Sequence, residues 1–304
     1  MGAPLTQAQL DALNTTIKAR FNAGLKVNRE DWRKVAGYVT SDGASNTYEW
    51  LSQFPAFREW VGPRQHKVAK ETAYTVKNRK FENTLDIPVE KVEDDEYGMY
   101  GDVAQSYGES VYDLQNDLVF GRIGNATAEI CYDGQYFFDT DHPVYPNEDG
   151  TGVAATVSNF QAGAGELWML LCTNRAPKPF YLQERVKPQL VSKVNAVTSD
   201  FVYENDAISY GGRWRGEGVC GFWQLAYGSK AELTEANFNA NFKAMMKVMG
   251  DGNRKLGIIP NLLVVGPENM AAAEALIKAV NKANGASNTN YGKVELLVSP
   301  WIAS

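Results

Sequence analysis

The chain has 304 residues, of which 44% are hydrophobic and 22% charged, and its formal net charge is −6. This composition is typical of a folded globular protein of one large or two small domains, and it excludes disorder over the whole length. The acidic balance argues against a protein that binds nucleic acid by neutralising phosphates. The three cysteines form no CxxC pair, which favours reduced, buried thiols.

Neither a secretory signal nor a membrane span is expected. Residues 1–13 have no basic region followed by an apolar stretch. The longest apolar runs, residues 167–172 and 258–265, are far too short to cross a bilayer.

The first expected element is an amphipathic helix that Thr6 can cap and Gly24 can end. Its apolar stripe consists of Leu10, Leu13, Ile17 and Phe21. Two interpretations remain open: the helix packs on its own domain, or it is an arm that packs on a neighbouring subunit. The mixed residues 26–47 that follow predict a connecting arm.

A basic stretch and then an acidic stretch follow an aromatic block at residues 48–60. The bases of residues 64–80 are Arg64, Lys67, Lys70, Lys77, Arg79 and Lys80. Period-two alternation on both sides of Asn78 predicts a two-stranded ribbon over residues 64–92, with Asn78 in the turn. A lone hairpin is marginally stable in water, so this ribbon would need a surface to lie on.

A long helix is predicted over residues 93–122. It opens on the acidic run Glu93-Asp94-Asp95-Glu96, which suits the positive end of a helix dipole. Its predicted apolar face consists of Val103, Tyr107, Val111, Leu114 and Leu118. Three glycines in its first half weaken the helical tendency.

The second half of the chain alternates loops, strands and helices. Residues 131–165 predict a loop with short strands, and 167–172 a buried strand or helix end. Further strands are expected at residues 180–190, 201–210, 218–226, 262–265 and 294–298. One helix should follow the N-cap Thr234, and another should run from Pro267 to about Ala283, between two apolar strands.

Asp139, Asp141 and His142 are the strongest catalytic candidates, because two carboxylates and an imidazole could bind a divalent cation. No further histidine or cysteine stands at zinc-site spacing. A structural role is favoured, with carboxylates that organise turns and a hydrogen-bonding histidine. There is no Gly-x-Ser-x-Gly motif and no phosphate-binding glycine loop, so neither an enzyme nor a cofactor is expected.

Several segments resemble the major head subunit of Mu-like bacteriophages. They are YEWLSQFPAFREWVG (48–62), VEDDEYG (92–98), CYDGQYFFDTDHPV (131–144), GFWQLAYGSKAELTEANF (221–238), LGIIPNLLVVGPENMAAAEAL (256–276) and VELLVSPWI (294–302). They occur in the family's order over nearly the whole chain.

The resemblance implies an α+β, HK97-like capsid fold. Its expected parts are an N-terminal arm (1–47), an aromatic segment with an extended β-hairpin loop (48–92), a peripheral domain with a spine helix (93–160) and an axial α/β domain (161–304). It also implies a shell of hexamers and pentamers around double-stranded DNA, in a virion assembled in the host cytoplasm. Scaffold, portal and decoration proteins are the expected partners.

Within such a shell, a charged ribbon is expected to lie on a neighbouring copy. The candidate inter-subunit contacts are Trp60, Arg64, Lys67, Lys70, Lys77, Arg79, Lys80, Glu93, Asp94 and Asp95. Two alternatives remain open: an encapsulin-like nanocompartment shell, and a metal-dependent hydrolase that uses Asp139, Asp141 and His142.

Overall fold

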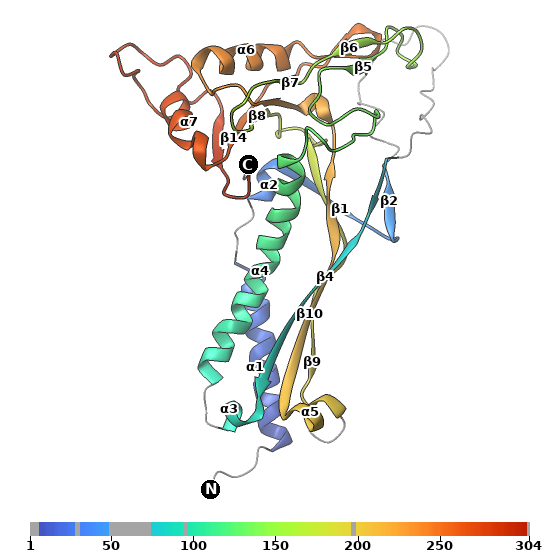
Figure 1. Cartoon of the computed structure of the whole chain (residues 1–304), viewed down its shortest axis with the longest axis vertical. Helices are drawn as coiled ribbons and strands as arrows, with labels where there is room; N and C mark the ends of the chain where they lie inside the picture. The colour runs from blue at the N-terminus through green and yellow to red at the C-terminus, as the bar shows by residue number, and fades with distance from the viewer. Residues whose placement is uncertain (1–5, 28–30, 49–73, 94–96, 196–198, 303–304) are drawn as a thin grey trace.

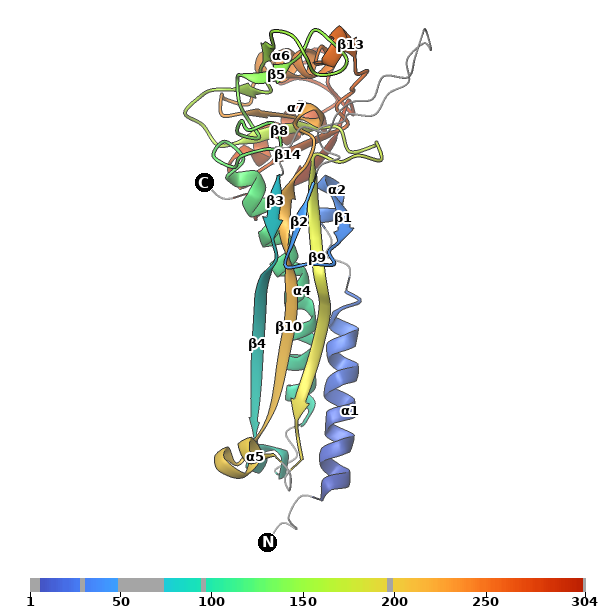
Figure 2. The same ribbon diagram turned by 90° about the vertical axis from the view of Figure 1, so that its right-hand side faces the viewer.

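The computed structural model describes residues 6–27, 31–48, 74–93, 97–195 and 199–302. The chain forms a long stem and a globular part at one end of it (Figure 1). In the stem, two helices lie along one side of three long strands. The view turned by 90° shows how narrow this stem is (Figure 2).

The stem is built on a four-stranded sheet of order β1-β9-β10-β4. Its strands are β1 (Ala36–Thr40), β4 (Arg79–Pro88), β9 (Phe180–Lys193) and β10 (Ala207–Cys220). β1 runs parallel to β9, whereas β9 with β10 and β10 with β4 are antiparallel. Beyond residue 184 the side chains of β9 alternate between exposed and half-buried, as expected when only one face of a sheet is covered.

Helix α1 (Gln7–Gly24) confirms the first predicted helix, including its cap. Thr6 accepts a hydrogen bond from the backbone of Gln9, and the Gln9 side chain accepts one from the backbone of Thr6. Leu10, Leu13, Ile17 and Phe21 are all buried. The helix packs on α4 of its own chain, which decides between the two interpretations of this segment.

Helix α4 (Tyr97–Gly124) confirms the predicted spine, and it is the longest helix of the described residues. The predicted start at Glu93 is wrong, because Glu93 ends a separate short helix and α4 begins at Tyr97. Three shorter helices accompany the stem: α2 (Trp32–Val35), α3 (Val89–Glu93) and α5 (Asp200–Asn205). One part of the predicted apolar face is wrong, because Val103 is 37% exposed. Gly101, Ala104 and Gly108 are buried in its place, since small residues allow α1 and α4 to approach closely.

The globular part contains a five-stranded sheet of order β15-β14-β8-β11-β7. Its strands are β7 (Phe160–Gln161), β8 (Trp168–Leu171), β11 (Ala226–Ser229), β14 (Leu262–Val265) and β15 (Glu295–Val298). Two helices pack on it: α6 (Glu235–Met246) and α7 (Met270–Ile277). The globular part also contains two small sheets. One pairs β5 (His142–Val144) with β6 (Ala155–Val157), and the other pairs β12 (Met249–Gly250) with β13 (Arg254–Lys255). Three 3-10 turns lie at residues 223–225, 251–253 and 267–269.

Most predictions for this part are confirmed. β8 and β14 are wholly buried, Thr234 caps α6, and β14 runs parallel to β15 with α7 between them. The expected extension of the last helix to Ala283 is wrong, because α7 ends at Ile277. The side-chain amide of Asn288 donates to the carbonyls of Leu276 and Ala279, at 2.9 and 2.8 Å. It thereby provides hydrogen-bond partners for carbonyl groups at the C-terminal end of the helix.

The strand predicted at residues 201–210 is only half right. Residues 200–205 form α5, Asp206 has a left-handed backbone with φ 45°, and β10 begins at Ala207. The connecting arm expected at residues 26–47 is also corrected, since it contributes β1 to the stem sheet and β2 (Ser45–Thr47) to a small sheet. The division of the chain at residues 47, 92 and 160 stays a prediction.

The ribbon prediction is wrong in the part of residues 64–92 that the structure describes. β3 (Thr75–Lys77) pairs with β2, and β4 pairs with β10 over its whole length, so the two strands do not pair with each other. Asn78 does not form a turn. Its amide donates to Ser41 Oγ at 2.8 Å and its oxygen accepts from Gln183 at 2.7 Å, which ties the chain to the stem as it passes from one sheet to the other.

The buried apolar side chains form two clusters. The larger one surrounds the five-stranded sheet and the adjoining end of the stem. The smaller one, at the far end of the stem, joins Leu13 and Ile17 of α1 to Ile87 of β4 and Ile208 of β10. Among the described residues, no helix is both long and apolar enough to cross a membrane.

Candidate assembly surface

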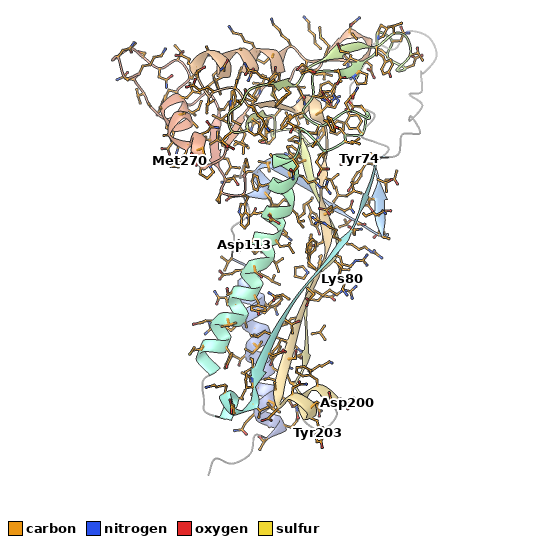
Figure 3. The ribbon with its side chains drawn as sticks, viewed as in Figure 1. Tyr74, Lys80, Asp113, Asp200, Tyr203 and Met270 are labelled. Atoms are coloured by element: carbon orange, nitrogen blue, oxygen red, sulfur yellow. The ribbon has the colours of Figure 1, made fainter. Side chains whose placement is uncertain are left out.

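Only three of the ten candidate contact residues are described in full. Trp60, Arg64, Lys67, Lys70, Asp94 and Asp95 lie outside the described residues, and Glu93 is the last residue of α3. Lys77 ends β3, and Arg79 and Lys80 begin β4. All three of these bases are exposed, and Figure 3 shows Lys80 on the flank of the stem opposite α4.

Arg79 has a partner within its own chain. Its guanidinium contacts the carboxylate of Glu217 on β10, with Nη2 3.1 Å from Oε1, and Glu217 is buried. Arg122 of α4 lies 3.7 Å from the same Oε1 and also binds Glu129. Burial would lower the pKa of Arg122, but these two carboxylates outweigh it and raise the pKa. This cluster links the edge strand β4 and helix α4 to β10 and to Glu129, which follows α4.

Because Arg79 already binds Glu217 of its own chain, it is a weaker candidate for a contact with a neighbouring subunit than Lys77 or Lys80. Glu217, which sequence reasoning missed, lies in the glycine-rich run 211–221, where nothing indicates that a carboxylate is buried. Its charge is tolerated because two guanidinium groups surround it.

The outer edge of the stem sheet is β4, which pairs with β10 on one side only. Its exposed side chains include Lys80, Glu82 and Asp86. Charged residues on an edge strand discourage unspecific pairing with other strands, while still allowing a contact of matched charge. The edge therefore suits selective contact between copies.

His142 is wholly buried and serves packing. Its Nδ1 lies 2.7 Å from Asp133 Oδ2, its Nε2 lies 3.2 Å from Asn159 Oδ1, and its ring stacks on Trp223 with centroids 4.0 Å apart. Both ring nitrogens are thus engaged within the protein.

The two carboxylates beside it do not converge on His142. Asp139 accepts hydrogen bonds from the backbone of Tyr136 and Thr140, at 3.2 and 2.7 Å. Asp141 is exposed, and its pKa is raised by partial desolvation and by the neighbouring Asp139. Within the described part of the chain, no three His, Cys, Asp or Glu side chains are placed to hold one metal ion. The structural role favoured for this motif is what the geometry supports.

The three cysteines are free and buried. Burial raises the pKa of the Cys220 thiol to about 12, and it raises that of Cys131 as well. Thiols in this state are poor nucleophiles, since the thiolate is the reactive form.

Comparison with known proteins agrees with this geometry. The sequence matches the family described as "Mu-like prophage major head subunit gpT" over residues 10–302. The major capsid protein of Escherichia phage Mu is 36% identical, with 98% of this chain and 99% of that protein covered.

Two solved structures of bacteriophage JBD30 cover the whole fold. A chain of its procapsid matches with a TM-score of 0.88 and 41% identity, covering 98% of this chain and 100% of that chain. A chain of its capsid matches with a TM-score of 0.75 and 32% identity, covering 99% and 100%.

The fold is thus that of the HK97-like proteins that build the capsids of tailed bacteriophages. Within that class, the chain belongs to the family of Mu-like major head subunits, and it is a major capsid protein. The nanocompartment and hydrolase alternatives are not favoured.

Proposed function

We propose that many copies of this chain assemble into hexamers and pentamers, which close into an icosahedral head around double-stranded DNA. The observation that carries this proposal is the match to the JBD30 procapsid chain, which extends over 98% of this chain and all of that one. Contacts between different surface patches of identical subunits can generate such rings and shells.

The proposal places the mature protein in the virion, after assembly in the host cytoplasm. The shell has a mechanical role and no catalytic one. One JBD30 capsid structure is described as decorated with minor capsid protein trimers, which supports a decoration partner for this shell. Scaffold and portal proteins are proposed as further partners.

The net charge of −6 fits a container for DNA. A strongly basic wall would bind phosphates unspecifically and hinder the movement of the packaged DNA. An acidic subunit avoids such adhesion, and the capsid then encloses DNA without reading its sequence.

Apart from Trp60, the contacts proposed between subunits are charged ones. The set is Trp60, Arg64, Lys67, Lys70, Lys77, Arg79, Lys80, Glu93, Asp94 and Asp95. A single exposed ion pair contributes only about 0–1 kcal/mol, but its repetition over every subunit of a shell fixes the register of neighbours.

The test combines assembly with charge reversal. The unmodified chain should form shells that negative-stain electron microscopy resolves. The triple variant Lys67→Glu, Lys70→Glu and Lys77→Glu should keep its far-ultraviolet circular dichroism but form no shells. The matched control, with arginine at the same three positions, keeps the charge and should assemble. Normal shells from the glutamate variant would contradict a role for these lysines.

A further inference from the structure

The open face of the stem sheet carries an excess of positive charge. Helices α1 and α4 lie along the other face, and between β2 and α5 no described element lies in front of β4, β9 and β10 (Figure 2). Arg213 and Arg215 flank the buried Trp214 on β10, so the alternation of a strand turns both toward the open face. Lys80, on the flank opposite α4, stands opposite Arg215 in the strand register (Figure 3).

The rest of the chain offsets these charges only in part. We call this surface the basic face and define it by four bases, Lys80, Lys187, Arg213 and Arg215. Lys187 belongs to it because it follows Val186, which pairs with Arg215. None of the ion pairs among the described residues involves these four bases. Glu82, opposite Arg213 on β4, is an acid beside them, and a surplus of positive charge remains.

An uncovered apolar patch adjoins the basic face. Val191 of β9 is 64% exposed, and it pairs with Gly211, which lies two residues from Arg213 on β10. A Cβ built on Gly211 would meet nothing within 4 Å, so the sheet is bare at this point. An exposed apolar patch rimmed by charged side chains is typical of a contact between proteins.

The tip of the same stem has complementary properties. Helix α5 is anchored there by Val202, which is buried in the smaller core. Asp200, Tyr203 and Glu204 fall within an arc of about 100° on the other side of the helix. Both acids are exposed and Tyr203 is 88% exposed, and Figure 3 shows Asp200 and Tyr203 at the end of the stem. Lys193, with its ammonium over the ring of Phe201 at 5.7 Å, is a base beside them.

These two surfaces match in charge and in apolar character. We propose that the tip of one stem docks on the basic face of a second copy of the chain. The ring of Tyr203 packs on Val191 and Gly211, while Asp200 and Glu204 face the bases around that patch. Tyrosine is enriched among the residues that dominate binding energy at interfaces, which makes its ring the anchor of this contact.

The fold requires a second copy as the occupant. Asp206 joins α5 directly to β10 at Ala207. Arg213 and Arg215 lie six and eight residues further along the same strand, which is about 20–26 Å away. Because Val202 fixes α5 to the end of the stem, the tip does not fold back over that distance. The contact joins different patches of two identical chains, and contacts of this kind build rings and shells.

This inference rests on the proposed shell, which it deepens by giving Lys80 and its neighbours a partner of opposite charge. The first experiment alters the tip. Asp200→Lys with Glu204→Lys, and separately Tyr203→Ala, should keep the circular dichroism of the subunit and lower the yield of shells by about tenfold or more. Adding Arg213→Glu and Arg215→Glu to the charge-reversed tip restores opposite charges and should restore shells.

The matched controls keep the charge or the ring. Asp200→Glu with Glu204→Asp, and separately Tyr203→Phe, should assemble like the unmodified chain. If the unmodified chain forms shells and the altered tips do so equally well, the docking contact is wrong while the shell proposal stands. If the unmodified chain forms no shells, the shell proposal fails and this contact fails with it.

The second experiment does not depend on the altered tips folding. Tyr203→p-benzoylphenylalanine keeps an aromatic ring at the tip and bonds to a neighbouring C–H group under ultraviolet light. In shells, irradiation should give dimers whose crosslinked peptides contain residues 186–193 or 207–216 of a second chain, and free subunits should give none. The control Tyr136→p-benzoylphenylalanine, at an exposed tyrosine beyond the end of α4, should not label these strands. Dimers that map to any other part of the chain, or no dimers from shells, would overturn the proposal.

Discussion

At the scale of single residues, glycine decides how the two stem helices meet. A Cβ built on Gly108 would lie 2.2 Å from Phe21 O, and one built on Gly24 would lie 2.1 Å from Gln105 O. Glycine weakens an isolated helix, so these positions are unfavourable by local propensity alone. They are used because the backbones of α1 and α4 approach too closely for any side chain.

We expect Gly108→Val to destabilise the unassembled subunit by about 2–3 kcal/mol, because overpacking forces the two helices apart. Urea unfolding followed by circular dichroism measures this change. Gly121→Ala is the matched control in the same helix, since its Cβ would meet nothing within 4 Å. It should be neutral, or stabilise by about 0.5–1 kcal/mol. Equal stability of the Gly108 variant and the unmodified chain would refute the close contact.

For the motif around His142, the sequence predicted the structural role of the histidine but not its partners. A structural histidine is indicated by the absence of other zinc ligands at the right spacing. Its partners Asp133 and Asn159 lie nine and 17 residues away, and Trp223 lies far along the chain. Only folding brings these groups together, so no spacing rule could have named them.

At the scale of elements, alternation predicted that a strand follows Asn78 but not which strand it pairs with. β4 exists as expected, and its partner is β10, more than 100 residues away. A period of two reports which side chains share a face, and it contains no information about the neighbouring strand. The assumption that adjacent strands form a hairpin therefore failed at Asn78, whose side chain bonds to Ser41 and Gln183.

The helical stripe of α1 was readable because it repeats over about three turns, from Leu10 to Phe21. Ile17 is wholly buried in the smaller core, so Ile17→Ala should destabilise the subunit by about 2–4 kcal/mol through the cavity it leaves. Thr16→Ala, on the exposed side of the same helix, should change stability by less than about 0.5 kcal/mol. Thermal and urea unfolding of both variants measure the difference. Similar values for the two would mean that α1 does not pack on the stem.

At the scale of the whole molecule, the globular part has a large buried core, whereas the far end of the stem is narrow and has a small one. The five-stranded sheet lies within the larger core, whereas the far stem depends on a small cluster around Ile17 and Ile208. A narrow stem leaves much of its surface exposed, and in a shell that surface is available to neighbouring copies. The family match and this exposed stem both agree with a subunit that packs against other copies in a capsid.

Hydrogen exchange on unassembled subunits should follow this division. Amides of β8 and β14, whose side chains are all buried, should exchange slowest. Those of α1 and the far half of β9 should exchange fastest among the regular elements, because they are held by fewer buried contacts. Mass spectrometry of peptides along the chain measures these rates. Uniform protection from end to end would show that the two cores unfold as one unit.

The amino-acid sequence by itself determined the family, the helices α1, α4 and α6, the buried strand β14 and the burial of residues 167–172, because each depends on local periodicity, capping or a distinctive run of residues. Only the tertiary structure decided that β4 pairs with β10, that α7 ends at Ile277, and that Arg79 binds Glu217. The physical reason is that local patterns fix which face of an element is apolar, whereas strand partners, helix ends and buried ion pairs are set by residues far away in the chain.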